Sequence, residues 1–148
     1  MSDGAYKAGD SEPGEIVVKT SGDADVGDEM QDGTILAGYF GGRALYVTPR
    51  DAPGAYSFNE AAKYAKNLNA HCHRDFRAPS KGELNVLWGN RNKGRLAGTF
   101  NESGSNSAGW YWSSSRSGIF NGWAQRFSHG FQNHGGRNSV LSLRCVRG

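Results

Sequence analysis

Cysteine is scarce in this sequence, and long apolar runs are absent. Of 148 residues only Cys72 and Cys145 are cysteines, and neither belongs to a C-x-x-C pair, which excludes a disulfide scaffold. No segment approaches the roughly 18 apolar residues of a transmembrane helix. Residues 1–15 lack the basic and apolar regions of a signal peptide, so we expect a protein made in the cytoplasm with no membrane span. We expect both thiols to be unpaired and buried, although the sequence also permits a Cys72–Cys145 bridge.

The length fits one domain. A chain of 148 residues buries about 68–70% of the surface that it exposes when unfolded, so it needs no disulfide or metal to fold. Residues 1–15 are small and polar and predict a flexible tail. Residues 16–148 are expected to form a single domain, in which residues 16–18 add a short strand. The 22 glycines follow no G-X-Y period, which excludes collagen and favours tight turns between short strands.

Charge is divided unevenly along the chain. Residues 1–32 hold nine acidic and two basic residues, whereas residues 33–148 hold fifteen basic and five acidic ones. An acidic tail on a basic domain can indicate a nucleic-acid binder. The basic residues are scattered singly, however, with no Lys/Arg run, so we expect no nucleic-acid partner.

The first half of the chain predicts a hairpin and two helices. Two β-rich runs, residues 34–40 and 43–48, flank Gly41-Gly42, which is a strong hairpin signal. Ser57-Phe-Asn-Glu60 and Ser80-Lys-Gly-Glu83 are capping boxes, in which each side chain satisfies a free backbone N–H at a helix start. The first helix is expected to reach Asn69 and to bury Ala61, Tyr64, Ala65 and Leu68. The second presents Leu84, Leu87 and Trp88.

The second half predicts antiparallel strands separated by glycine-rich loops. Strand-like segments occur at residues 110–115, 122–128 and 139–147. Trp123, Gln125 and Phe127 alternate onto one face of the second segment, and Leu141, Leu143 and Cys145 onto one face of the third. The order of hairpin, two helices and strands predicts an α+β domain.

The histidines and the acidic loop invite a metal hypothesis. His71 and His73 follow a helix end, and His129 and His134 have no neighbouring carboxylate in their segment. A metal site needs three or four converging ligands, and we find no such set. Residues 23–33 are rich in Asp and Gly but lack the spacing of an EF-hand, so a solvated turn is expected. We therefore predict no metal and no cofactor.

Catalytic patterns are also missing. Ser113-Ser114-Ser115 lacks the G-x-S-x-G elbow that exposes a nucleophilic hydroxyl. Cys72 lies between two histidines, but no third group would orient them. Glu60 and Glu83 are engaged in capping boxes, which leaves no carboxylate pair for acid–base catalysis. We predict a protein that is not an enzyme, with no catalytic residues.

A candidate binding surface lies between Gly118 and Leu141. Its mixture of aromatic, Asn, Ser, Gly, His and Arg residues is typical of a paratope, where rigid aromatics anchor a ligand and small polar groups adapt to it. A glycine-rich β-meander with incidental exposed residues would have the same composition. The candidate ligand-binding residues are Gly118, Ile119, Phe120, Asn121, Ala124, Arg126, Ser128, His129, Phe131, Asn133, His134, Gly135, Gly136, Asn138, Ser139, Val140 and Leu141.

Three ordered motifs resemble a known family. Asp75-Phe-Arg-Ala-Pro-Ser80 with Glu83-Leu84, then Trp110-Tyr-Trp-Ser-Ser-Ser115, then Leu143-Arg-Cys-Val-Arg147 resemble the motifs of DUF1566 domains. The resemblance covers residues 33–148 and implies a C-type-lectin-like fold of the formylglycine-generating-enzyme subgroup. The cysteine pair of that enzyme and the calcium motifs of carbohydrate-binding lectins are absent. The resemblance therefore implies neither that activity nor calcium-dependent sugar binding.

Within that family the ending is most similar to the variable proteins of diversity-generating retroelements. The resemblance implies a W-x-Q-x-F-x-x-G-x-Q framework, here Trp123, Gln125, Phe127, Gly130 and Gln132, with diversified residues between. It implies a phage-borne protein that binds a protein or glycan receptor, with Ile119, Phe120, Phe131 and Leu141 as exposed apolar residues. Of these, the two phenylalanines, together with Arg126, are the expected anchors.

Two other functions remain open at this point. The chain could be a binding or structural module of the same family with a fixed ligand, or a lectin-fold enzyme. A template repeat and a reverse-transcriptase gene in the flanking DNA would separate the diversified protein from the fixed module. Turnover that requires copper or a thiol would indicate the enzyme. The sequence does not indicate an oligomeric state.

Overall fold

The computed structural model describes residues 23–103, 109–119, 121–136 and 138–148. The expected tail at residues 1–15, the expected strand at residues 16–18 and the candidate binding residue Phe120 lie outside the described residues. The described part is an α+β structure with two helices of ten residues each and two small antiparallel sheets.

The predicted hairpin is confirmed. Strand β1 (Ile35–Phe40) pairs with β2 (Arg43–Val47), and β2 also pairs with β6 (Val146–Arg147), so that the sheet order is β1-β2-β6. Gly41 and Gly42 form the turn with φ of +60° and +78°, a region that side chains with a Cβ rarely adopt. The sheet therefore joins the start of the described chain to its end.

Both capping boxes are confirmed. Helix α2 (Phe58–Asn67) begins after Ser57, and helix α3 (Lys81–Asn90) begins after Ser80. In each case the serine hydroxyl accepts from the backbone N–H of the glutamate three residues later, which itself accepts from the serine N–H. Helix α2 ends at Asn67, slightly before the predicted end, and a 3-10 turn, η2 (Gly94–Leu96), follows α3.

The second sheet has the order β3-β4-β5. Strand β3 (Trp110–Arg116) and strand β4 (Gly122–Arg126) match two predicted strands. Strand β5 (Gln132–Gly135) was not predicted, because its sequence is polar and does not alternate. The predicted strand over residues 139–147 is wrong for most of its length. Only Val146–Arg147 is a strand, and the preceding residues pair through single bridges at Leu141 and Ser142.

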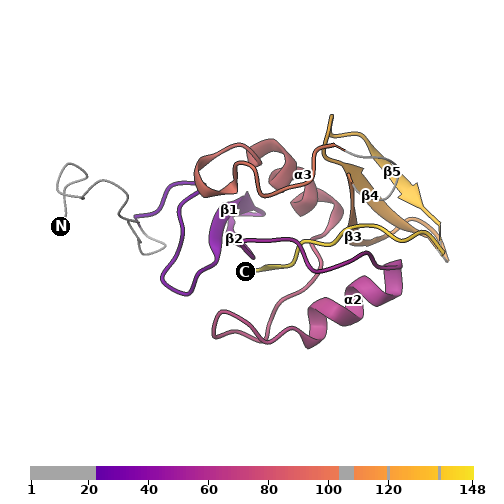
Figure 1. The fold of residues 1–148 in the computed structure, drawn as a ribbon, viewed down its shortest axis with the longest axis horizontal. Helices are drawn as coiled ribbons and strands as arrows, with labels where there is room; N and C mark the ends of the chain where they lie inside the picture. Colours follow the sequence, from indigo (N-terminus) through magenta and orange to yellow (C-terminus); the bar gives the residue numbers. More distant parts are fainter. Residues whose placement is uncertain (1–22, 104–108, 120, 137) are drawn as a thin grey trace.

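Figure 1 shows how the C-terminal segment connects the two sheets. The β3-β4-β5 sheet lies at one end of the molecule, and the yellow C-terminal segment runs from it, alongside β3, to the first sheet. Helix α3 contacts both sheets, and α2 lies on the opposite side of the C-terminal segment. The end of the chain therefore passes between elements formed early in the sequence.

Two clusters of buried side chains form the core. One packs the β1–β2 hairpin against α3 and includes Tyr111 and Phe127, and the other packs α2 against β3 and includes Trp112 and Leu143. Arg144 is also fully buried, and its guanidinium donates to the Thr48 carbonyl, to Asp51 and to Thr99. These bonds hold the C-terminal segment in the core.

The cysteine predictions are confirmed in part. Neither cysteine is in a disulfide, and Cys145 is buried. Cys72 is exposed, so the prediction that both thiols are buried is wrong. It lies in a tight turn whose central residues, His71 and Cys72, have φ of 53° and 64° and which pairs Ala70 with His73. In the part of the chain that the structure describes, no helix is long and apolar enough to cross a membrane.

Candidate binding groove

The two faces of strand β4 have different environments. Trp123 and Gln125 point to the side covered by α3, whereas Ala124 and Arg126 point to the other side, because side chains alternate along a strand. The cross-strand neighbours Trp110 and Trp112 lie on the same side as Ala124 and Arg126. The predicted alternation therefore separates a scaffold face from a second face.

The scaffold face is fixed by a chain of side-chain hydrogen bonds. Gln125 is fully buried, and its Nε2 donates to Asn85 Oδ1 at 2.9 Å and to the Gly130 carbonyl at 3.0 Å. Gln132 Nε2 donates to Gln125 Oε1 at 3.2 Å and to the Lys81 carbonyl at 3.0 Å. Both glutamines thus bind β4 and β5 to helix α3.

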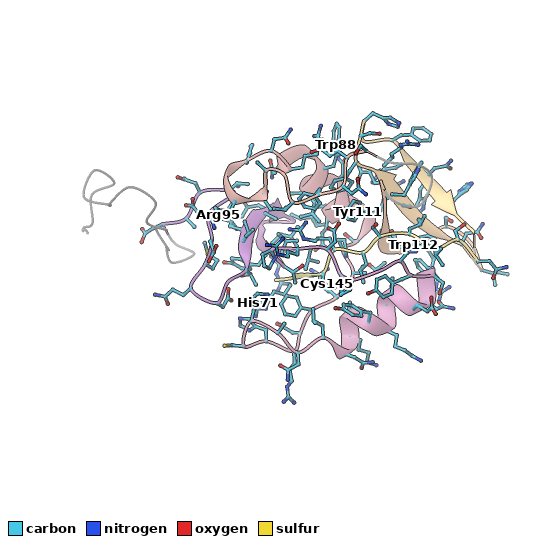
Figure 2. All side chains as sticks on the ribbon, viewed as in Figure 1. His71, Trp88, Arg95, Tyr111, Trp112 and Cys145 are labelled. Carbon is cyan, nitrogen blue, oxygen red and sulfur yellow. The ribbon has the colours of Figure 1, made fainter. Side chains whose placement is uncertain are left out.

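Phe127 and Gly130 complete this face. The Phe127 ring is fully buried between Phe100 and Tyr111, and its carbonyl accepts from Trp88 Nε1 at 3.2 Å. Gly130 has a φ of +83°, and a Cβ on it would lie 2.6 Å from the Trp88 ring, so only glycine fits. Trp88 lies on the α3 side of the sheet and Trp112 on the α2 side, where it contacts Phe58 (Figure 2).

A groove lies on the other face. It separates β4 and β5 from the segment formed by residues 138–141, and its volume is about 470 Å³. Trp110 and Ala124 contribute to it from the inner strands. The residues that line the groove are Trp110, Ala124, Asn133, His134, Gly135, Asn138, Ser139, Val140 and Leu141. Eight of these nine were predicted as binding residues, and Trp110 was not, because its sequence context marks only a strand.

Two predicted binding residues are buried rather than exposed. Ala124 is 2% exposed and Leu141 is 8% exposed, so the predictions of an outward-pointing Ala124 and a solvent-exposed Leu141 are wrong. The Leu141 backbone pairs in both directions with Tyr56, which pins it beneath the surface. Ala124 lies beside Trp112 in the core around α2. Both residues line the groove, and because they are buried they form part of its floor and not of its exposed rim.

Among the described residues of this half of the chain, three large apolar side chains are exposed, of which Val140 lines the groove, Phe131 contacts Trp110 and Ile119 lies in the β3–β4 turn. Ile119 is 82% exposed, Phe131 is 55% exposed and Val140 is 47% exposed. The Phe131 ring packs edge-on against Trp110, with a centroid distance of 6.3 Å, and near His129. Phe131 is therefore held at the surface by neighbours of the groove.

The remaining predicted residues surround the groove at the surface. Arg126 is half-buried, and its Nε donates to Ser128 Oγ at 3.1 Å. Asn121 is half-buried, and its carbonyl accepts from the Ser117 N–H in the β3–β4 turn. The exposed members of the predicted set are Gly118, Ile119, Ser128, His129, Phe131, Asn133, His134, Gly136, Asn138, Ser139 and Val140.

The first two histidines have a structural function. His71 Nδ1 lies 2.9 Å from the Asp32 carbonyl, and His73 Nε2 lies 2.8 Å from Asp32 Oδ2. The tight turn at Cys72 thus clamps the acidic loop that precedes β1. Within residues 23–103, 109–119, 121–136 and 138–148 no group of three or more His, Cys, Asp or Glu side chains could hold a metal ion.

Hydrogen bonds and ion pairs engage the carboxylates that follow residue 33. Asp51 accepts from Tyr111 and Arg144, and its burial raises the pKa of the carboxyl. Asp75 pairs with Arg147 and Glu102 with Arg91. Glu60 and Glu83 cap α2 and α3. None of the described residues that line the groove carries a carboxylate. Its chemistry is that of amides, a hydroxyl, an imidazole and apolar groups.

No protein-family model matches this chain, and no curated protein matches it in sequence.

Proposed function

We propose that this chain is a ligand-binding module that recognises a receptor through the groove between the β3-β4-β5 sheet and residues 138–141, without catalysis. The observation that carries the proposal is the division between the two faces of the sheet. The residues of the W-x-Q-x-F-x-x-G-x-Q pattern bind the core and α3, whereas the residues between them line or surround the groove.

This division supports the diversified-receptor hypothesis in particular. A surface that is to vary must be free of bonds on which the fold depends, and exposed substitutions usually change stability by no more than about 0.5 kcal/mol. Ser128, His129 and Phe131 are exposed, whereas their neighbours Phe127 and Gln132 make the structural contacts. A C-type-lectin-like scaffold and a phage-borne origin belong to this proposal, on the strength of the motif resemblance.

The composition of the groove supports binding in preference to catalysis. Ligand sites combine apolar walls with a few polar groups that fix orientation. Trp110 and Val140 provide apolar contact, while Asn133, Asn138 and Ser139 provide hydrogen-bonding groups. Acid–base catalysis most often uses a histidine oriented by a carboxylate; the imidazole of His134 packs against Trp123, and the described carboxylates after residue 33 are engaged elsewhere.

A display library tests the proposal. One library randomises exposed residues around the groove, namely Ser128, His129, Phe131, Asn133, Asn138, Ser139 and Val140. The matched control library randomises Trp123, Gln125, Phe127, Gly130 and Gln132. We expect the first library to yield folded binders against an arbitrary protein such as hen lysozyme, and the control to yield unfolded chains. Failure of the first library to fold, or to give any binder, would contradict the proposal. A template repeat beside a reverse-transcriptase gene would favour the diversified protein over a fixed-ligand module.

A further inference from the structure

The last third of the chain carries charge of only one sign. Residues 103–148 contain five arginines and no aspartate or glutamate. Two of these arginines belong to the scaffold, because Arg144 binds Asp51 in the core and Arg147 binds Asp75. Of the other three, Arg137 lies outside the described residues, and Arg116 and Arg126 pair with Gly122 and Trp110 on the side of the sheet where Ala124 lies.

Further cationic or imidazole groups extend this basic region. Lys81 Nζ lies 3.5 Å from the centre of the Trp123 ring, and the Trp123 ring lies 5.5 Å from His134, which lines the groove. His129 packs near Phe131 at the rim. Because Trp123 points to the α3 side of β4, Lys81 lies on that side, and His129 is the group that extends the basic region at the rim.

The carboxylates that follow residue 33 are engaged away from the groove. Asp51 accepts from Tyr111 and Glu60 from the Ser57 N–H, and arginines donate to Asp75, Glu83 and Glu102. These five carboxylates therefore stabilise the scaffold, and none of them lines the groove. A ligand that brings a cation finds no described carboxylate among the lining residues, whereas a ligand that brings a carboxylate finds arginine and imidazole groups nearby.

The apolar rim indicates the size and kind of partner. Phe131 and Val140 are exposed, and Trp110 packs against Phe131 and lines the groove. Exposed apolar groups beside an arginine are typical of protein interfaces. Val140 adds an aliphatic packing surface to the aromatic rings of Trp110 and Phe131.

We propose that the partner is an acidic protein segment that places an aromatic or aliphatic side chain in the groove and directs its flanking carboxylates to Arg126 and His129. This inference rests on the proposed binding function and specifies its partner. Complementary charge would steer the encounter and fix the orientation of the segment, while the apolar side chain would supply most of the affinity.

A peptide selection tests the inference. Random dodecapeptides displayed on phage are panned against the immobilised protein at low salt, and peptides that still bind the variant Asn138→Trp are discarded. Asn138 is exposed and lines the groove, so tryptophan there should fill the groove without disturbing the core. We expect the retained peptides to carry Asp or Glu on both sides of an aromatic or aliphatic residue.

Charge variants then test the electrostatic part. For a retained peptide, we expect Arg126→Gln to raise the dissociation constant by about tenfold. A rise in NaCl from about 50 to about 300 mM should have an effect of the same size. Arg95→Gln is the matched control. Arg95 is an exposed arginine at the end of the molecule remote from the β3-β4-β5 sheet, so binding should be unchanged (Figure 2). Thermal melts must show that all three variants remain folded.

The contrary results are distinct. Retained peptides that are neutral or basic, or that bind equally well in both salts, would overturn the acidic partner and leave the binding function standing. Binding of glycans on an array that Asn138→Trp abolishes, with no retained peptide, would also overturn it. The proposed function itself would fall only if the randomised library described above produced no folded binder.

Discussion

The side chain of Gln125 donates to Asn85 at 2.9 Å, and this bond ties the strand beneath the groove to helix α3. Gln125 is fully buried, whereas Asn85 is exposed on the helix. An uncharged buried amide must have partners, because a buried polar group without a hydrogen bond costs about 1–3 kcal/mol. The groove is therefore built on a polar network and not on apolar packing alone.

Loss of that network should destabilise the fold. Gln125→Ala would leave the Gly130 carbonyl and Gln132 Nε2 short of partners, so we expect a loss of about 1–3 kcal/mol in the free energy of unfolding. Asn133→Ser is the control, since Asn133 is exposed on the other face, and it should change stability by no more than about 0.5 kcal/mol. Urea denaturation measures both. Equal stability of the two variants would argue against the network.

Two nearby glycines should respond differently to the same substitution. Gly130→Ala forces a Cβ to within 2.6 Å of the Trp88 ring at a φ of +83°, and we expect a loss of about 1–3 kcal/mol. Gly136→Ala meets only Ser139 Oγ at 3.8 Å and should be nearly neutral. Thermal melts of the pair provide the comparison. Similar melting temperatures would mean that Gly130 is not required by the scaffold.

Much of the fold was predictable because its signals are local. The capping boxes at Ser57 and Ser80 each occupy four residues, and the hairpin is encoded by two glycines between β-rich runs. Strand β5 was missed because it is defined by pairing with β4 and not by its own polar sequence. The turn at His71 and Cys72 was missed for a related reason. Non-glycine residues with positive φ are uncommon, and this turn is stabilised by contacts to the distant Asp32.

The sequence predicts which face of β4 carries the candidate binding residues, but it does not predict which of those residues are buried in the groove wall. Alternation along β4 separates Gln125 from Ala124, and that period is readable in the sequence. The burial of Leu141 depends on backbone pairing with Tyr56, 85 positions earlier in the chain, which no local pattern reports. Trp110 enters the groove only because residues 138–141 lie opposite it. Long-range pairing therefore determined which predicted surface residues became part of the groove wall.

Truncation of two large aromatic core residues of the binding half should be costly. Trp112 and Phe127 are fully buried, so Trp112→Ala and Phe127→Ala should each lower the free energy of unfolding by about 3–5 kcal/mol. Simultaneous replacement of Ser128, His129 and His134 by alanine is the control, because all three are exposed, and it should shift stability far less. Guanidinium titrations measure these differences. If the triple variant lost more stability than either truncation, the assignment of Trp112 and Phe127 to the scaffold would be wrong.

Acid should remove the contribution of Glu83. Burial alone would raise the pKa of this carboxyl, but the bonds from Arg77 and from the Ser80 N–H outweigh it and lower the pKa below its usual value. A lowered pKa in the folded state stabilises the fold above the unfolded pKa of about 4.3, and this stabilisation is lost as the pH falls through the folded value. Below about pH 4, the parent should therefore lose stability faster than Glu83→Gln, as followed by urea titrations at several pH values. Parallel pH curves would contradict this.

The two thiols should react at very different rates. Cys72 is exposed, whereas Cys145 is 1% exposed, and desolvation raises the pKa of the Cys145 thiol to about 12 despite the nearby Arg144 charge. Because the thiolate is the reactive form, Cys145 is both shielded and protonated at neutral pH. A disulfide reagent such as Ellman's should therefore label one thiol rapidly in the native protein and a second only after unfolding. Cys72→Ser should abolish the fast phase, and Cys145→Ser should leave it unchanged.

Because the fold contains no disulfide, the double serine variant should still melt cooperatively. Rapid labelling of two thiols in the folded parent would show that the C-terminal segment opens around Cys145, and the buried position of that segment beside the groove would then be wrong.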